Sequence, residues 1–577
     1  MSYMDKYKSW LDNPVFDDET KKELLSIKGN ESEIEDRFYK DLEFGTGGLR
    51  GVIGAGSNRM NKYTVRRATQ GLADYILEQA GKKGADKGVV IAFDSRNFSK
   101  EFAGEAACVL CANGIKAYVF DSLRPTPELS FSVRELGCIA GIVITASHNP
   151  PEYNGYKVYW EDGAQITPPH DSGIISKVNA INDYADAKIM PYEEAAGKGL
   201  YKEIGKEIDE RYDEELLKLV QNIDIVRKEA AGIKIVYTPL HGTGNLPVRR
   251  VLKALGFENV FVVPEQELPD GNFPTVSYPN PEDANAFKLA LNLAKEKDAD
   301  IVLATDPDAD RLGVYVKDYE NGGYHSLTGN MSGILICQYI LEQRKEKGTL
   351  PENGAIVSTI VTTDMAKELA KRYNLKHIET LTGFKYIGEQ IKLFEQNHTY
   401  EYVFGFEESY GCLVGTHARD KDAVVAVMSL CEAAAYYKSK GISMWKKMQE
   451  IYETYGYFKE GLASITLKGT EGAKQIQAMI QKLRDNPPEK IGSYEVLKVR
   501  DYKQKVIIDK KNNSTEETKL PVSNVLYYEL ENKAWCCVRP SGTEPKIKFY
   551  MGVAGDNNED ATDRLKQLKD AVLEQFQ

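Results

Sequence analysis

Three aspartates alternate with small residues in the segment 306–311 (DPDADR). Carboxylates spaced in this way on a loop can converge on one hard cation such as Mg²⁺. An EF-hand is excluded, because Arg311 stands where that loop needs glycine and Lys317 where it needs glutamate. A solvated acidic turn is the alternative, although a strand end is a poor place for three unpaired like charges. The following arginine suits a metal whose shell is completed by a phosphoryl oxygen.

A possible nucleophile stands in the segment 145–150 (TASHNP), where Ser147 follows an apolar run and precedes His148. The serine could be an exposed nucleophile, or the segment could be no more than a polar turn. A Ser-His-Asp hydrolase is disfavoured, because adjacent side chains cannot easily face each other and the G-x-S-x-G motif is absent.

Three further segments carry polar groups suited to sugars or phosphates. The segment 405–409 (GFEES), followed by 419–422 (RDKD), offers partners for paired hydroxyls, or is an ordinary polar loop. The segment 539–546 (RPSGTEPK) could form a phosphate-binding nest, or a turn between strands. The segment 44–51 (FGTGGLRG) is a flexible loop with a single arginine. The chain has neither a P-loop nor a G-x-G-x-x-G motif, which disfavours nucleotide-dependent phosphoryl transfer and dinucleotide chemistry.

Short Val/Ile-rich runs separated by helix-compatible stretches recur three times along the chain. We expect strands at 88–96, 115–121 and 141–150, at 233–242, 257–264 and 299–311, and at 355–364, 375–383 and 401–409. Each repeat should form a largely parallel sheet covered by helices. Ligands of such sheets bind beyond the carboxyl ends of the strands, where three of the polar segments lie. We therefore expect three similar domains around one cleft.

The last ~115 residues have a different pattern, typical of a smaller α+β domain. It predicts helices at 470–485 and from about 559, with strands at 524–530, 535–538 and 547–553. The fold class expected is thus α/β, with three similar domains of mixed or parallel sheet and a smaller C-terminal α+β domain. We place the domains at 1–205, 206–320, 321–458 and 459–577, and expect linkers at 163–200, 268–282 and 508–519.

The composition is that of a packed globular protein, with 42% hydrophobic and 28% charged residues among 577. A net charge of −12 argues against a broad nucleic-acid or membrane surface, but not against a small anionic substrate. Eight cysteines form no disulfide pattern, and the pair Cys108 and Cys111 lies in a helix-like apolar face. With neither a signal peptide nor a membrane span in view, we expect a cytoplasmic protein.

The segments TASHNP, DPDADR, GFEES and RPSGTEPK, with FGTGGLRG before them, resemble those of the α-D-phosphohexomutases. The likeness runs from about residue 40 to the end, in the family's order. Within the family it is greatest to the phosphoglucomutases whose sugar loop reads Gly-Phe-Glu-Glu, a group that includes related phosphopentomutases. The resemblance implies an isomerase that interconverts glucose 1-phosphate and glucose 6-phosphate. Phosphomannomutase and phosphopentomutase activities are the alternatives within the family.

By this resemblance, Ser147 carries a phosphoryl group, and one Mg²⁺ per chain is held by the phosphoserine with Asp306, Asp308 and Asp310. The phosphoserine donates to the sugar phosphate, and glucose 1,6-bisphosphate is the intermediate and activator. Arg50 and Arg311 would neutralise charge in the transition state. Lys157 and His148 are both candidates for proton transfer, and the sequence does not rank them.

The resemblance also implies residues that bind the substrate. Thr382, Gly383, Glu407, Ser409 and Lys421 match sugar-reading positions, and Arg539, Ser541, Gly542 and Thr543 match the distal phosphate clamp. Arg311 would also bind the substrate. This chain departs from the common pattern at Phe406, inserted in the sugar loop, and at Phe384-Lys385 after Thr-Gly. These loops govern the choice among glucose, mannose and pentose. The expected partners are small sugar phosphates, and the sequence leaves monomer and dimer open.

Two functions from other classes remain as alternatives. In a metal-dependent sugar-phosphate phosphatase, Asp306 would be the nucleophile, but that motif usually has Thr or Val where Asp310 stands. A catalytically idle binding protein would be expected to have lost Ser147 or one of the aspartates, and none is lost.

Overall fold

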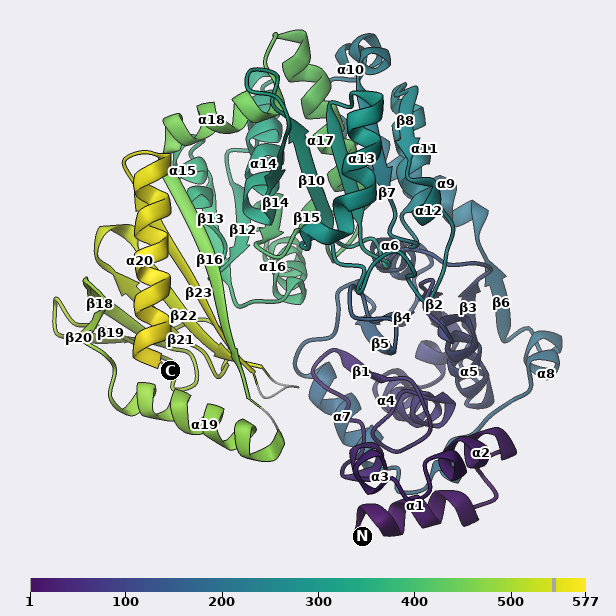
Figure 1. The fold of residues 1–577 in the computed structure, drawn as a ribbon. Helices are drawn as coiled ribbons and strands as arrows, with labels where there is room; N and C mark the ends of the chain where they lie inside the picture. Colours follow the sequence, from purple (N-terminus) through teal and green to yellow (C-terminus); the bar gives the residue numbers. More distant parts are fainter. Residues whose placement is uncertain (1, 468, 542–545, 577) are drawn as a thin grey trace. The chain divides into compact units, whose positions relative to one another are not determined.

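The computed structural model describes residues 2–467, 469–541 and 546–576. Contacts divide the chain into two compact units (Figure 1). The first comprises Met1–Leu350 and Phe384–Met444, and the second Pro351–Gly383 and Trp445–Gln577.

Three short helices open the chain, α1 (Tyr3–Asp12), α2 (Asp18–Ser26) and α3 (Glu31–Phe38). Each begins at a residue whose side-chain oxygen accepts a hydrogen bond from a backbone N–H of the first turn. Trp10 stacks on Phe16 with ring centroids 4.0 Å apart, and this aromatic core anchors the helices on the first domain.

The first sheet has the order β1-β5-β4-β2-β3-β6. Its strands are β1 (Gly48–Val52), β2 (Val89–Phe93), β3 (Ala117–Phe120), β4 (Ala140–Ile144), β5 (Tyr153–Trp160) and β6 (Tyr201–Ile204). β2, β3, β4 and β6 run parallel, whereas β1 and β5 are antiparallel to their neighbours. Every residue of β2 and β4 is buried, as expected for strands covered on both faces. The helices are α4 (Lys62–Lys87), α5 (Ser99–Ala112), α6 (Thr126–Glu135), α7 (His170–Ala180) and α8 (Tyr192–Gly197).

The second sheet has the order β11-β10-β9-β7-β8. It contains β7 (Lys234–Thr238), β8 (Asn259–Val262), β9 (Ile301–Thr305), β10 (Leu312–Lys317) and β11 (Tyr324–Leu327). The first three strands are parallel, and β10 and β11 extend the sheet antiparallel. The helices of this region are α9 (Lys206–Leu217), α10 (Ile223–Glu229), α11 (Asn245–Leu255), α12 (Pro264–Glu267) and α13 (Lys288–Lys297).

The third repeat contributes elements to both units. The first unit contains α14 (Gly329–Glu346), α16 (Phe384–Asn397), α17 (Ala423–Ser439) and the antiparallel hairpin of β14 (Glu401–Glu407) and β15 (Gly411–Val414). The second unit contains the parallel pair β12 (Gly354–Thr359) and β13 (Lys376–Thr380), with α15 (Met365–Arg372).

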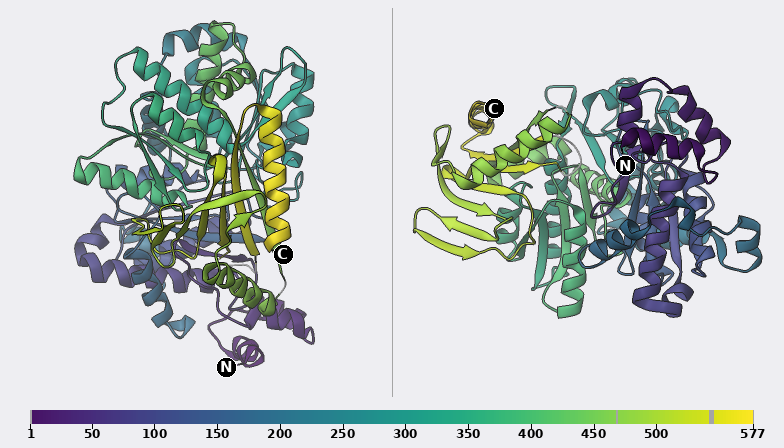
Figure 2. Two further views of the ribbon diagram at one scale, coloured as in Figure 1. Left: turned by 90° about the vertical axis from the view of Figure 1, so that its left-hand side faces the viewer. Right: turned by 90° about the horizontal axis from the view of Figure 1, so that it is seen from below.

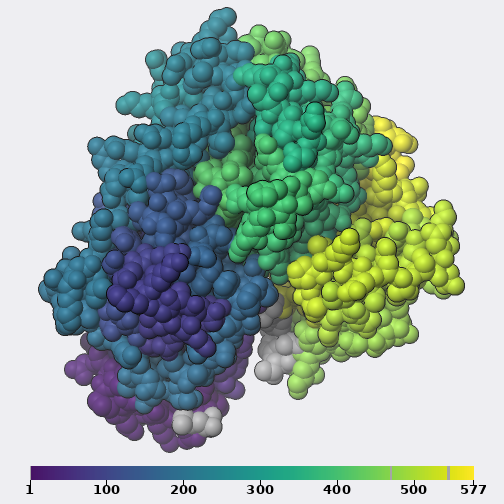
Figure 3. Space-filling view, turned by 180° about the vertical axis from the view of Figure 1, so that it is seen from behind, coloured from purple at the N-terminus to yellow at the C-terminus, as the bar shows by residue number. Residues whose placement is uncertain are grey.

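The C-terminal sheet runs β16-β23-β22-β21-β18-β19-β20, with β17 beside β18, and its pairs are antiparallel. After α18 (Met444–Tyr455), its strands are β16 (Tyr457–Thr466), β17 (Lys490–Ile491), β18 (Tyr494–Asp501), β19 (Val506–Asp509), β20 (Ser514–Glu517), β21 (Leu526–Leu530), β22 (Trp535–Pro540) and β23 (Lys546–Gly555). One apolar core joins the sheet to α19 (Gly469–Asp485) and α20 (Asn558–Phe576), and α20 lies along β16 and β23 (Figure 2). In the space-filling view this yellow and yellow-green domain forms one continuous body (Figure 3).

The predicted fold class, three α/β domains and a further β-rich C-terminal domain with helices, is confirmed. Two of the three expected linkers are wrong, because these segments contain regular secondary structure. Residues 163–200 contain α7 and α8, and residues 508–519 contain β20. The third, 268–282, has no helix or strand. No helix in the described part of the chain is long and apolar enough to cross a membrane.

Candidate active site

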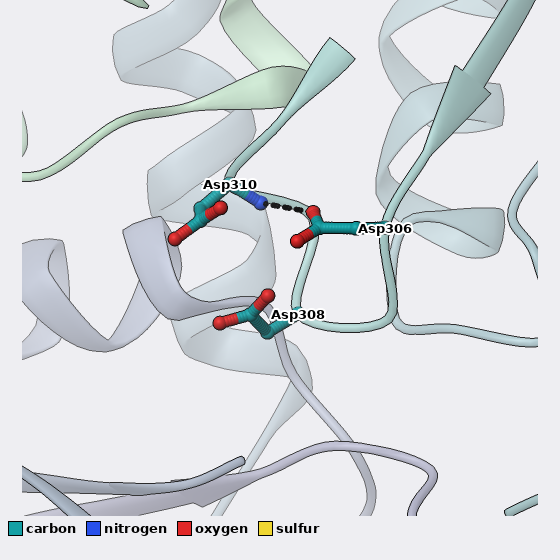
Figure 4. A group of neighbouring side chains, drawn as sticks. All are labelled: Asp306, Asp308 and Asp310. Carbon is teal, nitrogen blue, oxygen red and sulfur yellow. Dashed lines mark hydrogen bonds between the residues drawn. The ribbon is translucent and has the colours of Figure 1, made fainter. Parts of the chain in front are cut away.

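The acidic loop connects β9 to β10, and its three carboxylates point toward one another (Figure 4). Asp306 and Asp308 are fully buried, and Asp310 is 2% exposed. One oxygen of Asp306 accepts hydrogen bonds from the backbone N–H groups of Asp310 (3.1 Å) and Arg311 (3.0 Å), which tightens the turn. One ligand oxygen from each aspartate lies within 4.8 Å of the others, as a single cation would require.

The loop that follows β7 packs against this turn. The N–H of Thr243 donates to the carbonyl of Pro307 at 2.8 Å. A Cβ on Gly242 would lie 2.4 Å from the Cα of Pro307, so only glycine allows the two loops to approach this closely. Ala309 has a φ of 50°, a left-handed conformation that turns the chain between the second and third aspartates.

Two partly buried lysines offset the charge of the aspartates. Lys157, on β5, lies 2.8 Å from Asp308 and 3.7 Å from Asp310, and Lys421 lies 3.2 Å from Asp310. Burial and the neighbouring carboxylates raise the pKa of Asp306 well above its usual range. Burial acts in the same direction on Asp308, but the charge of Lys157 outweighs it and lowers the pKa of Asp308. Asp308 and Asp310 likewise raise the pKa of Lys157 against the effect of burial.

Ser147 lies at the turn between β4 and β5 and reaches the acidic loop. Its hydroxyl donates to Asp306 Oδ2 at 2.7 Å, although the residues are 159 apart in the chain. His148 Nδ1 lies 3.1 Å from the same hydroxyl oxygen. Burial, together with the charges of Arg311 and Arg50, lowers the pKa of His148 well below its usual value, which favours the neutral imidazole. The structure thus brings the candidate nucleophile, a candidate base and the candidate metal ligands together.

The two predicted arginines flank this group. Arg50, on β1, donates to Asn149 Oδ1 at 3.2 Å, which ties it to the loop of Ser147. Arg311 follows the acidic loop, binds Glu282, and lies 3.8 Å from Asp310. The pKa of Arg311 is raised by Glu282 and the aspartates despite its burial, so it remains a cation.

The predicted sugar loop lies in the first unit, at the end of β14. Glu407 is 6% exposed and Ser409 follows it at the turn to β15. Phe406 is fully buried, its ring lies 5.5 Å from that of Phe404, and a Cβ on Gly333 would lie 2.4 Å from it. The inserted residue therefore packs in the core.

The remaining predicted residues belong to the second unit. Thr382 and Gly383 follow β13, and Gly383 has a φ of 114°, which favours glycine. Arg539 lies near the end of β22, and the N–H of Ser541 donates to the carbonyl of Lys546 at 2.7 Å, which closes the base of the loop. Gly542 and Thr543 lie outside the described residues.

Two residues that contact the site were missed in the sequence. Thr126, at the start of α6, donates from its hydroxyl to Asp308 Oδ2 and from its N–H to the Asp308 carbonyl, both at 2.9 Å. Arg96, just after β2, binds the backbone of the Ser147 loop. The available signals were a Thr-Pro pair at a helix start and an Asp-Ser-Arg segment at the end of an apolar run.

Comparison with known proteins agrees with this arrangement. The models of α/β/α domains I, II and III of phosphoglucomutase/phosphomannomutase match residues 41–185, 210–322 and 328–455. The chain belongs to the phosphoglucomutase/phosphomannomutase family. A phosphoglucomutase of Staphylococcus saprophyticus is 36% identical over 96% of this chain and 98% of its own length. One of Staphylococcus aureus strain USA300 is 36% identical over 93% of this chain and 94% of its own.

Solved structures of the family share the fold. A phosphoglucomutase/phosphomannomutase family protein of Burkholderia thailandensis has a TM-score of 0.64 at 20% identity, over 92% of this chain and 97% of its own. The open form of the Paramecium phosphoglucomutase parafusin has a TM-score of 0.67 at 17% identity, over 93% of this chain and 96% of its own. At these identities the likeness concerns the fold alone.

The acidic loop of this family member suits a divalent cation. One oxygen of Asp308 and one of Asp310 are buried with no hydrogen-bond partner in the described part of the chain. Buried carboxylate oxygens without partners are costly unless a cation binds them. Of the described residues, only this trio forms a cluster of three or more acidic, histidine or cysteine side chains fit to hold a metal.

Proposed function

We propose that this chain is a phosphoglucomutase that interconverts glucose 1-phosphate and glucose 6-phosphate through a phosphoserine at Ser147 and a glucose 1,6-bisphosphate intermediate. The observation that carries the proposal is the hydroxyl of Ser147, 2.7 Å from a buried trio of aspartates. Relatives named phosphoglucomutase that match nearly the whole chain support the same activity.

Each residue of the site has a role in this reaction. Asp306, Asp308 and Asp310 would hold one Mg²⁺, which supplies neutralising charge for the transferring phosphoryl group. When the sugar hydroxyl attacks phosphoserine, its new bond to phosphorus forms as the bond from phosphorus to Ser147 Oγ breaks. The sugar hydroxyl loses a proton and Ser147 Oγ gains one, and His148 and Lys157 are the candidates for this transfer. Transfer from the other end of the bisphosphate then restores the phosphoserine.

The remaining predicted residues would bind the substrate. Arg50 and Arg311 would bind the phosphoryl group that moves, and Glu407, Ser409, Lys421, Thr382 and Gly383 the sugar. Arg539 with 541–543 would bind the other phosphate. Mannose 1-phosphate and a pentose 1-phosphate are the alternative substrates. Phe406 departs from the common sugar-loop pattern, but its side chain is buried in the core, so we propose that it would not contact the sugar.

Some properties rest on the sequence and the family. We infer a cytoplasmic enzyme that acts on small sugar phosphates and binds neither nucleic acid nor membrane. The domain limits 1–205, 206–320, 321–458 and 459–577 stay our proposal.

The test is isomerisation of glucose 1-phosphate, mannose 1-phosphate and ribose 1-phosphate with Mg²⁺ and the matching bisphosphate. We expect the highest kcat/KM for glucose 1-phosphate, loss of turnover with a chelator, and recovery when Mg²⁺ is added. Release of inorganic phosphate in place of isomerisation would identify a phosphatase. A preference for another sugar would correct the substrate while retaining the mutase.

A further inference from the structure

Arg96 donates hydrogen bonds to backbone carbonyls of the loop that carries Ser147. One terminal nitrogen of its guanidinium donates to the carbonyl of Ser147 at 2.6 Å and also to that of Asn149. The other donates to the carbonyls of Pro150 at 2.8 Å and Tyr153 at 3.0 Å. The carbonyls of Ser147, Asn149 and Pro150 belong to the irregular segment between β4 and β5, and Tyr153 is the first residue of β5. Arg96 thus joins this segment to the strand that follows it.

The guanidinium is itself held in place on three sides. Its Nε lies 3.4 Å from Asp94 Oδ2, and both side chains are fully buried. The other oxygen of Asp94 accepts hydrogen bonds from the Arg96 N–H and the Ser99 hydroxyl, at 2.9 and 2.7 Å. The ring of Phe273, from the second domain, covers the guanidinium with its centroid 5.0 Å from Cζ.

The loop needs this support because Ser147 has an unfavourable backbone. Its φ is 53°, in the left-handed region that residues with a side chain rarely adopt. This conformation directs the hydroxyl to Asp306. A relaxed loop would move the hydroxyl, and a shift of about 1 Å at a reacting group can cost roughly 100-fold in rate.

We propose that Arg96 is a positioning residue that holds the Ser147 loop in its reactive conformation, an inference that rests on the proposed role of Ser147. Lysine cannot replace it. The planar guanidinium donates to four carbonyls, whereas an ammonium has only three donors, which lie close together on one atom. Arg96 touches the loop's backbone and leaves the sugar-binding residues untouched, so kcat should depend on it more than KM does.

The test uses the full chain with Arg96→Ala and Arg96→Lys, with Arg59→Ala as the matched control. Arg59 is also buried and donates to backbone carbonyls, those of Asp36 and Asn58, but has no contact with the Ser147 loop. We expect kcat to fall by about 100-fold in both Arg96 variants, with KM changed less than about threefold. Guanidinium at non-denaturing concentration should restore part of the kcat of Arg96→Ala, and methylammonium should not.

Hydrogen exchange separates this inference from the proposed function. The amides of residues 146–149, 152 and 153 should exchange faster in Arg96→Lys than in the parent, while those of 3–38 do not change. Arg59→Ala should leave the exchange of 146–153 unchanged. An inactive parent with this exchange pattern would refute the mutase and retain the support of the loop by Arg96. Unchanged exchange in 146–153, or a kcat equal to that of Arg59→Ala, would overturn the inference.

Discussion

Ser147 has a small buried side chain, whose hydroxyl makes two polar contacts, to Asp306 and His148. At the scale of a single residue, its hydroxyl therefore matters to chemistry far more than to stability. This differs from Asp306, whose carboxylate also accepts two backbone N–H groups and holds its own loop together. A change at Ser147 is consequently the cleaner test of the proposed nucleophile.

Ser147→Ala should lower mutase turnover by about 10³-fold or more, as loss of other covalent nucleophiles does. Intact-protein mass spectrometry after incubation with glucose 1,6-bisphosphate should find one added phosphoryl group on the parent and none on the variant. The control is Ser57→Ala, which removes a buried hydroxyl bound to the Lys40 carbonyl, away from the site. Full activity in Ser147→Ala would end the phosphoserine hypothesis.

At the scale of elements, α6 links two parts of the site. Its first residue, Thr126, binds Asp308 of the acidic loop. Ser130 accepts the N–H of Arg419 at 2.8 Å, and Arg134 donates to the carbonyl of Thr416 at 2.6 Å. One helix of the first domain thus contacts the acidic loop and the segment that leads to Lys421.

Thr126→Val should weaken both metal binding and turnover, because it removes a hydroxyl that donates to a buried carboxylate. One hydrogen bond to a charged group is worth about 1.5 kcal/mol, which corresponds to a loss of roughly tenfold. Titration calorimetry with Mn²⁺ measures the affinity, and steady-state kinetics the turnover. Ser132→Ala is the matched control on α6, since its hydroxyl donates only to the Glu128 carbonyl of the same helix. Equal affinities in the two variants would assign Thr126 no role at the metal loop.

A second feature at this scale is Glu432 of α17, which is 1% exposed. Its carboxylate contacts the residues that precede α10. One of its oxygens accepts the N–H groups of Gln221 at 2.6 Å and Asn222 at 2.5 Å, and the Tyr339 hydroxyl at 2.9 Å. Burial outweighs these donors and raises the pKa of Glu432 to about 7. The folded state therefore retains this proton over a pH range in which the unfolded chain has released it.

The sign of the resulting pH dependence follows from linkage. Between the ordinary glutamate pKa and about 7 the folded protein binds more protons, so its stability should fall as pH rises, by roughly 3 kcal/mol at most. Glu432→Gln retains the accepting oxygen and cannot titrate. Between pH 5 and pH 8, the midpoint of urea unfolding should fall more in the parent than in this variant. Identical pH dependence in both proteins would show that Glu432 does not titrate there.

The sequence predicted three strands in each repeat because apolar runs are local patterns, but it missed neighbouring strands such as β1, β5 and β10. It could not reveal contacts made by folding. Thr126 meets Asp308 across 182 residues, and the carbonyls held by Arg96 lie some 50 residues beyond it. Phe406 was interpreted as part of a sugar loop, yet its alternation with Phe404 on one strand places both in the core. The charged stretch around β20 was taken for a linker because an exposed hairpin has no apolar pattern.

At the scale of the whole molecule, the third repeat is shared between two units. In the second unit, Glu379 of β13 binds Lys367 at 2.8 Å and Arg500 of the C-terminal sheet at 2.9 Å. Burial opposes ionisation here, but the two cations lower the pKa of Glu379 to about 2. This partly buried network attaches the strand before Thr382 to the domain that carries Arg539.

A mutase differs from a phosphatase in needing a second phosphate site, which we have proposed at Arg539. A guanidinium can bind phosphate through two parallel hydrogen bonds, and Arg539 is the proposed anchor. Binding energy remote from the reacting bond also promotes the reaction. Arg539→Ala should therefore lower kcat/KM for glucose 1-phosphate by roughly 2–4 kcal/mol, with kcat reduced as well as KM raised.

The decisive comparison is between this loss and the effect of Arg539→Ala on hydrolysis of a small phosphate ester that has no second phosphate. We expect the variant to hydrolyse that ester almost as fast as the parent does. Arg564→Ala is the matched control, because this arginine of α20 binds Asp560 of its own helix at 2.9 Å. It should leave both reactions unchanged. Equal losses on the two substrates in Arg539→Ala would make the residue structural. If Arg539→Ala loses activity on neither substrate, the C-terminal domain does not belong to the site. A mutase must bind its substrate's second phosphate in both orientations of the sugar, so a residue of that site could not be dispensable.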